Sequence, residues 1–248
     1  MTACGIGRGA IWLCPMTDNP HHHVATAPDA PANMGPAITL DRLVVGRGGV
    51  PLTQPLSLRL EAGSVWQIIG NNGSGKTSLI RVLAGLLDPL AGQVTQDWTE
   101  ANVAPIRLFD PVWQRQIAWH PVTPALKPGP SVRDTLMAHG GMTSDTVTAV
   151  LAEWGLARLA EQPVQYLSAG QRKRLDLARL SHDPCPIWLL DEPTVTLDRE
   201  ARALLGRVLA RHRDQGGLAI VASHDALTID GTLQTLALGT DEVTGAVS

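Results

Sequence analysis

The feature that most constrains this chain is a glycine-rich segment that fits the pattern GxxxxGK[ST] at every fixed position. The segment reads Gly70, Asn71, Asn72, Gly73, Ser74, Gly75, Lys76 and Thr77, with Ser78 following. A compact apolar run at 64–69 precedes it, and apolar residues at helical spacing follow at 77–87. A chance glycine-rich turn rarely has both neighbours, so we predict a phosphate-binding loop between a buried strand and a helix.

Each residue type in this segment suits phosphate binding for a physical reason. Glycines let consecutive backbone N–H groups turn toward phosphate oxygens, and the start of the following helix adds a favourable dipole. Lys76 offers a positive charge to the β- and γ-phosphates, and Thr77 offers a hydroxyl to Mg²⁺. We therefore expect the whole segment 70–78 to bind a nucleoside triphosphate.

A second polar pair, Asp191 and Glu192, ends the apolar run 186–190. Neighbouring side chains of a strand point to opposite faces, so the two carboxylates can hold different positions. Asp191 is our candidate for the Mg²⁺ site, and Glu192 is the candidate base that polarises an attacking water. A solvated strand end would explain such a pair by itself, but the phosphate motif earlier in the chain favours function.

The order of patterns along the chain predicts an α/β fold with a mixed, mainly parallel sheet. Strand patterns lie at 38–45, 56–60, 64–69, 187–190, 218–222 and 232–238, and helical patterns at 77–87 and 200–213. The middle segment, 102–182, is expected to be helical, with Ser144 and Ser168 as N-caps. We predict an α/β core from 37–101 and 183–248, and a disordered N-terminal tail over 1–36.

The composition and charge of the chain limit the kinds of partner and cellular setting that it can have. The net charge of −3 argues against binding nucleic acid through overall charge. No apolar run approaches the roughly 20 residues that a membrane span needs, and no export signal is expected. The three cysteines form no CxxC pattern, as expected of a reduced, cytoplasmic protein.

Three further motifs carry a family resemblance. The stretch 167–171, Leu-Ser-Ala-Gly-Gln, is similar to the LSGGQ signature of ATP-binding-cassette (ABC) ATPases, with alanine in place of the first glycine. The stretch 195–198 resembles the D-loop of that family, and His224, after an apolar strand, resembles its switch histidine. These motifs occur in the order that the family requires. The chain is thus identified as a member of the ABC ATPases over about residues 38–240.

The resemblance implies a P-loop NTPase fold of the ABC type with an inserted α-helical subdomain at 102–182. It also implies an ATP-hydrolysing enzyme that works as a head-to-tail homodimer, with two ATP molecules and their Mg²⁺ ions between the copies. Lys76, Glu192 and His224 would then be catalytic, and Thr77 and Asp191 would hold the metal. Ser168 and Gly170 of the opposite copy would face each nucleotide site, and Gln171 and Asp198 are also expected to bind nucleotide.

A narrower resemblance is to the ATP-binding subunits of cytochrome c maturation systems. It rests on the run 60–70, on Arg172, Arg174 and 177–180 after the signature, and on 215–218. It implies a peripheral subunit on the cytoplasmic face of the bacterial inner membrane, bound to an integral-membrane permease and other cytochrome c maturation proteins. The subunit would energise haem export or release of a haem-loaded chaperone. Energising the transport of another small molecule, or regulation by nucleotide without turnover, stays open.

Two features depart from the family pattern. Residues 42–50 contain no aromatic side chain for stacking on adenine. The glutamine that the family places after the strand 115–119 is missing, and His120 or Thr123 is the candidate for its position. We therefore expect coupling between the nucleotide and the membrane partner to be altered. Arg172, Lys173 and Arg174 are expected to form a solvated helix face.

Overall fold

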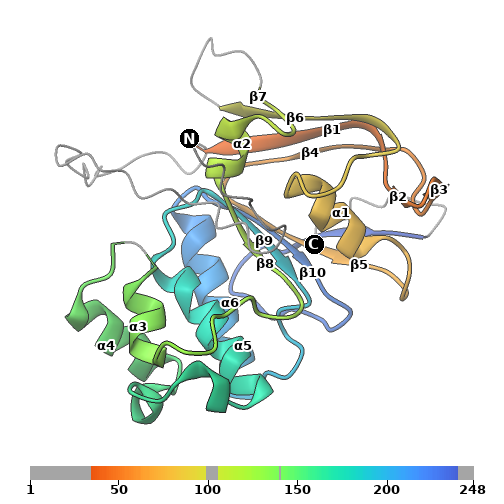
Figure 1. The fold of residues 1–248 in the computed structure, drawn as a ribbon. Coiled ribbons are helices and arrows are strands. Elements are labelled where there is room, and N and C mark those ends of the chain that lie inside the picture. The colour runs from red at the N-terminus through yellow and green to blue at the C-terminus, as the bar shows by residue number, and fades with distance from the viewer. Residues whose placement is uncertain (1–34, 99–105, 140, 240–248) are drawn as a thin grey trace, which may run out of the picture.

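The computed structural model describes residues 35–98, 106–139 and 141–239, so nearly all of the predicted tail, 1–36, lies outside the described residues. Its centre is a parallel sheet (Figure 1). The strand order is β11 (Gln234–Ala237), β5 (Ser64–Ile69), β10 (Leu218–Ala222), β9 (Ile187–Asp191) and β8 (Ile117–His120). Because all these strands run the same way, their carboxyl ends meet at one edge, where the predicted phosphate motifs follow β5 and β9.

A second, antiparallel sheet lies against one side of this core (Figure 1). Its strand order is β4 (Leu56–Leu60), β1 (Pro36–Val44), β6 (Ala91–Trp98) and β7 (Ile106–Arg107). A short hairpin, β2 (Gly46–Arg47) and β3 (Val50–Pro51), extends from it. Helix α1 (Lys76–Leu83) packs between the two sheets, where Ile38, Trp66 and Leu79 share one apolar cluster. The short helix α2 (Pro111–Arg115) follows β7.

The remaining helices cover the other face of the parallel sheet (Figure 1). They are α3 (Val132–Met137), α4 (Ser144–Glu153), α5 (Ala169–Ala178) and α6 (Arg199–Asp214), with 3₁₀ turns at Ala157–Leu159, Val164–Tyr166 and Arg179–His182. Neighbours in a strand point to opposite faces, so Val65 joins the cluster under these helices while Trp66 faces α1. The predicted α/β fold with a mixed, mainly parallel sheet is confirmed.

The expected helical segment, 102–182, differs from the structure at its start. It contains β7 and β8, and β8 forms the edge of the parallel sheet beside β9. Ile117 and Ala118 are buried there, because an edge strand in a covered sheet needs apolar residues on both faces. Apart from the short helix α2, the helical part therefore begins after His120.

Helix ends also differ from the sequence-based expectation. Helix α1 ends at Leu83, because Gly85 adopts a φ of 68° and the left-handed conformation stops the helix. The N-cap of α4 is Thr143 and not Ser144, since the Thr143 hydroxyl accepts a hydrogen bond from the Thr146 amide at 3.2 Å. None of the helices in the described part of the chain combines the length and apolarity that a membrane span requires.

Candidate nucleotide-binding site

The glycine-rich loop connects the end of β5 to the start of α1, at the carboxyl edge of the parallel sheet. Gly70 has a φ of 149°, and a Cβ added there would lie 2.5 Å from the carbonyl oxygen of Leu238 and 2.6 Å from Ser74 Oγ. Only glycine fits this close approach. Asn71, Asn72 and Gly73 are exposed at the tip of the loop, and Ser78 is half-buried in the first turn of α1.

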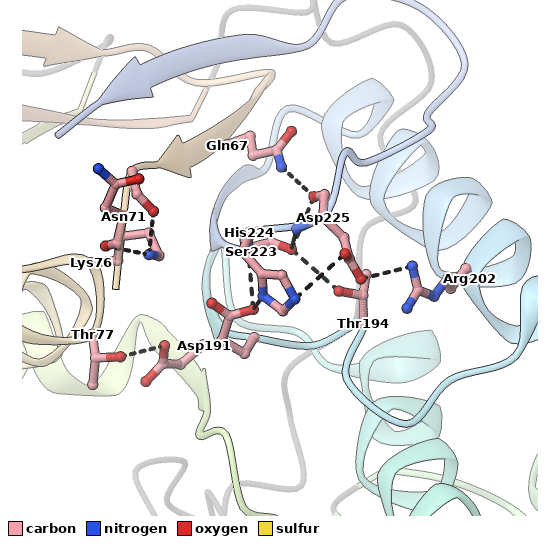
Figure 2. A network of polar contacts seen from close by, with 12 residues as sticks. Gln67, Asn71, Lys76, Thr77, Asp191, Thr194, Arg202, Ser223, His224 and Asp225 are labelled. Atoms are coloured by element: carbon pink, nitrogen blue, oxygen red, sulfur yellow. Dashed lines mark hydrogen bonds and ion pairs between the residues drawn. The ribbon is translucent and has the colours of Figure 1, made fainter. Parts of the chain in front are cut away.

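Lys76 and Ser74 are the polar groups inside the loop. The Lys76 ammonium is buried and donates to the carbonyl oxygens of Gly70 at 2.7 Å and Asn71 at 3.1 Å (Figure 2). The buried Oγ of Ser74 has no hydrogen-bond partner among the described residues. A buried hydroxyl without a partner is costly, and a phosphate oxygen would satisfy it. The loop therefore presents a held cation and an unpaired hydroxyl to an anionic ligand.

Thr77 and Asp191 meet across the site, one from the start of α1 and one from the end of β9. Thr77 Oγ1 donates to Asp191 Oδ1 at 3.0 Å (Figure 2). Burial raises the pKa of the Asp191 carboxyl, while the Thr77 hydrogen bond lowers it and nearby Glu192 raises it further. A hydroxyl and a carboxylate are the oxygen ligands that Mg²⁺ prefers, so these two residues suit the metal of a nucleotide complex.

Glu192 and His224 stand beside this pair. Glu192 has a φ of 47°, and its amide donates to the carbonyl oxygen of Ala222 at 2.8 Å. Oε2 of Glu192 lies 2.8 Å from His224 Nδ1. The side chain of Glu192 is 17% exposed and that of His224 is 54% exposed, so water can reach both. The sequence analysis predicted Glu192 as a base and His224 as a switch histidine, and in the structure the two side chains are in contact.

A supporting network that the sequence analysis missed holds the segment after His224 (Figure 2). The carbonyl oxygen of Asp225 accepts from Gln67 Nε2 at 2.7 Å and from Ser223 Oγ at 3.0 Å. The Asp225 carboxylate pairs with Arg202 of α6 at 2.8 Å. Arg202 Nε also donates to the carbonyl oxygen of Leu197 at 3.2 Å. The signal in the sequence was an acid directly after His224, whose distant partners only the fold reveals.

The predicted signature residues lie at the start of α5. Ser168 is its N-cap: Ser168 Oγ accepts from the Gln171 amide at 3.2 Å, and Gln171 Oε1 accepts from the Ser168 amide at 2.8 Å. This reciprocal pair is a capping box, which fixes the first turn of the helix. A Cβ on Gly170 would lie 3.0 Å from the carbonyl oxygen of Thr196, so the D-loop packs closely on this turn.

Asp198 connects the D-loop to the signature helix. It caps α6 by accepting from the Ala201 amide at 3.0 Å, and it also pairs with Arg174 of α5. Among the described residues, no hydrogen bond or ion pair joins Ser168 or Asp198 to Lys76 or Thr77. The sequence-predicted residues thus form two groups, the phosphate loop with its acids and the signature helix with the D-loop.

The position of the missing glutamine is occupied by a buried cluster. His120 Nδ1 lies 3.1 Å from Asp176 Oδ2, and Lys173 Nζ donates to the carbonyl oxygens of Pro121 and Val122 at 3.1 Å each. The expectation of a solvated face was wrong for Lys173, which is 2% exposed. The helix turns this side toward the loop after β8, where the two carbonyl oxygens replace water around the ammonium. Thr123 is exposed.

Comparison with known proteins agrees with these motifs. The ABC transporter family model matches residues 53–195. The chain is 42% identical over 187 residues to the "Cytochrome c biogenesis ATP-binding export protein CcmA" of Rhodopseudomonas palustris, which covers 74% of this chain and 89% of that protein. The protein of the same name from Cupriavidus pinatubonensis is 36% identical, covering 82% of this chain and 90% of that protein.

Solved structures show the same fold at low sequence identity. A putative ABC transporter ATP-binding protein from Pyrococcus furiosus aligns with a TM-score of 0.67 at 22% identity, over 80% of this chain and 96% of that one. A bacterial Atm1-family ABC exporter with ATP bound aligns with a TM-score of 0.68 at 23% identity, over 88% of this chain and 40% of that one.

Proposed function

The chain belongs to the ABC transporter family, and from this premise we propose that it is the ATP-hydrolysing subunit that energises c-type cytochrome biogenesis. The observation that carries the cytochrome assignment is the identity of 36–42% to relatives named for that process, over about nine-tenths of their length. The observation that carries the chemistry is the Thr77–Asp191 and Glu192–His224 geometry beside the phosphate loop.

The phosphate loop would bind the β- and γ-phosphates of ATP. Its backbone amides and the Ser74 hydroxyl would donate to phosphate oxygens, and Lys76 would exchange its two carbonyl partners for them. Thr77 and Asp191 would hold Mg²⁺, which neutralises phosphate charge when it is bound. Gly70, Asn71, Asn72, Gly73, Gly75 and Ser78 complete the proposed cradle.

Glu192 would orient and polarise the water that attacks the γ-phosphate. Its contact with His224 Nδ1 fixes the carboxylate in one direction, and the other ring nitrogen, Nε2, would contact the phosphate. That nitrogen lies 3.5 Å from Asp225 Oδ1, a contact that a γ-phosphate oxygen would replace. In this proposal Glu192 handles the water, and His224 holds both the acid and the phosphate.

The signature group would complete the site of a second copy. Ser168 begins α5, and the free N–H groups and dipole of a helix start attract an anion. Gly170 and Gln171 lie in the same turn. Asp198 forms an ion pair with Arg174, which lies further along the same helix. A head-to-tail homodimer would place this surface on the γ-phosphate of the partner. Hydrolysis would remove the charge that the two copies share and so open the dimer.

The proposed setting is the cytoplasmic face of the bacterial inner membrane. The relatives are named as ATP-binding export proteins of cytochrome c biogenesis, which supports a complex with an integral-membrane permease and other maturation proteins. Within that complex, ATP hydrolysis would drive haem export or the release of a haem-loaded chaperone.

The test is complementation of a native host that lacks this gene. Wild type and Lys76→Ala are expressed at equal level, and c-type cytochromes are detected by haem staining after electrophoresis. We expect wild type to restore covalent haem and Lys76→Ala to leave intact apocytochrome without it. Normal staining in the deleted host would overturn the cytochrome assignment and point to another cargo. Full rescue by Lys76→Ala would instead favour nucleotide-independent regulation.

A further inference from the structure

The loop that leaves β8 is fastened to the signature helix by side chains at two consecutive points. At the end of the strand, His120 Nδ1 lies 3.1 Å from Asp176 Oδ2. At the next two residues, the carbonyl oxygens of Pro121 and Val122 both accept from Lys173 Nζ at 3.1 Å. Lys173 and Asp176 are three residues apart on α5, so they lie on one face of that helix.

The three side chains that make these contacts are buried, and burying polar side chains is costly unless each has a partner. His120, Lys173 and Asp176 are each at most 2% exposed. Burial lowers the pKa of the Lys173 amine. Burial alone would raise the pKa of Asp176, but His120, Arg179 and Lys173 together hold it below its ordinary value. Removing Lys173 takes away the donor that the carbonyl oxygens of Pro121 and Val122 share, and removing Asp176 takes away the partner of His120 Nδ1.

We call the buried side chains of His120, Lys173 and Asp176 the clamp. It lies between the two groups of the nucleotide site, the phosphate loop with its acids and the signature helix with the D-loop. On one side, β8 pairs with β9 in parallel, and β9 leads directly into Asp191 and Glu192. On the other side, Lys173 is little more than one helical turn from the N-cap Ser168, and the intervening backbone is regular α-helix. These contacts therefore join the loop after β8 to the helix that carries the signature turn.

We propose that Lys173, together with His120 and Asp176, is a positioning residue that sets the place of the signature turn relative to the phosphate loop. It acts through the backbone of Pro121 and Val122 and not by touching the nucleotide. The clamp adjoins the position where the family pattern has a glutamine, and there this chain holds the loop after β8 through hydrogen bonds from Lys173 to two backbone carbonyl oxygens. The inference rests on the proposed function, because the signature turn matters only if it completes a hydrolytic site.

The test is a double-mutant cycle on the purified full chain with Mg-ATP, measuring nucleotide affinity and ATPase rate separately. Lys173→Met keeps the length of the side chain and removes its charge. We expect it to lower kcat roughly 10- to 100-fold, the cost of a small misplacement at a reacting centre, while ATP affinity changes less than about twofold. Lys127→Met is the matched control, because Lys127 is an exposed lysine outside the clamp, and it should behave as wild type.

The second arm introduces Lys173→Met into a Ser168→Ala background. If Lys173 acts by placing the signature turn, the Ser168→Ala variant has already lost most of what that turn contributes to hydrolysis. Adding Lys173→Met should then lower kcat by less than about twofold. An equal fall in both backgrounds would show a general structural effect and overturn the inference. Thermal unfolding is measured for each variant. Should Lys173→Met fail to fold, Lys173→Arg replaces it in the cycle with the same expected non-additivity.

The outcomes separate this inference from the proposed function. A wild-type chain without ATPase activity overturns both. An active wild type with Lys173→Met equal to it overturns the positioning role and leaves the proposed function standing.

Discussion

His224 Nδ1 lies 2.8 Å from Oε2 of Glu192, so the ends of the neighbouring strands β10 and β9 are joined by an acid–imidazole contact. The backbone amide of His224 lies 3.4 Å from the same oxygen. One carboxylate oxygen thus contacts both the ring and the backbone of His224, in a residue whose φ of 47° already restricts its backbone. We therefore expect the two residues to act as a unit in the proposed hydrolysis.

The first prediction is that the effects of substituting Glu192 and His224 on kcat are not additive. Each of Glu192→Gln and His224→Ala should lower kcat about 10²- to 10⁴-fold, the range typical for a proton-transfer group. The double variant should be no more than about twofold slower than Glu192→Gln alone, because His224 acts largely through that carboxylate. Steady-state phosphate release measures all three. Multiplied losses in the double variant would mean that the two residues act independently.

The second prediction separates the two roles of Ser168. As an N-cap, it contributes stability that alanine should remove, at a cost of about 0.5–2 kcal/mol in the free energy of unfolding, whereas glycine costs only a few tenths. Both substitutions remove the hydroxyl that would meet the γ-phosphate. We therefore expect Ser168→Gly to unfold like wild type and yet to hydrolyse ATP as slowly as Ser168→Ala. A fully active Ser168→Gly would limit this residue to capping.

The third prediction is that, without nucleotide, Gly70→Ala lowers the free energy of unfolding more than Gly73→Ala does. A Cβ at Gly73 would meet nothing within 4 Å, so Gly73→Ala should cost about 1–2 kcal/mol from its φ of 84° alone. At Gly70 the same methyl would collide with Leu238 and Ser74, which adds about 1–3 kcal/mol of overpacking. Chemical denaturation measures the difference between the two variants. Equal stabilities would show that the loop relaxes around the added methyl.

The fourth prediction concerns pH and His212, a buried residue of α6 whose ring stacks on Trp188 with centroids 3.6 Å apart. Burial lowers the pKa of His212 to about 4 from 6.5. Because His212 binds a proton more readily in the unfolded chain, its contribution to stability is fully present above pH 6.5. That contribution is lost as the pH falls toward 4. The loss approaches about 3 kcal/mol.

The matched variant for this pH dependence is His212→Phe, which retains a ring against Trp188 and does not titrate. Denaturant unfolding of both proteins at pH 7, 5.5 and 4.5 should show the difference between them shrinking, or turning in favour of the variant, as the pH falls. A difference that is constant over this range would exclude His212 as the source.

Much of the fold could be predicted because its signals are local. The strands at 56–60, 64–69 and 218–222 have the predicted bounds, since the first alternates apolar and polar residues and the other two are compact, mainly apolar runs. The phosphate motif specified its own turn, as the strained Gly70 shows. The meeting of Thr77 with Asp191 was also foreseeable, because parallel strands end at one edge of the sheet.

What escaped prediction depends on partners distant in the sequence. Lys173 looked solvated beside Arg172 and Arg174, because nothing near it shows that two carbonyl oxygens of the loop after β8 would face it. The contacts of Asp225 with Gln67 and Arg202 have the same character. Side-chain pairs of this kind follow from how whole elements pack, which a local pattern does not encode.

The composite nucleotide site is tested most directly by measuring the mass of the Glu192→Gln variant in solution with Mg-ATP, by light scattering after gel filtration. Blocked hydrolysis should trap two copies around shared nucleotide, giving twice the monomer mass of 26.4 kDa, with the monomer restored by EDTA and in the Lys76→Ala, Glu192→Gln double variant. A protein that binds ATP but stays at the monomer mass at saturating Mg-ATP would contradict the composite site on which the proposed mechanism rests.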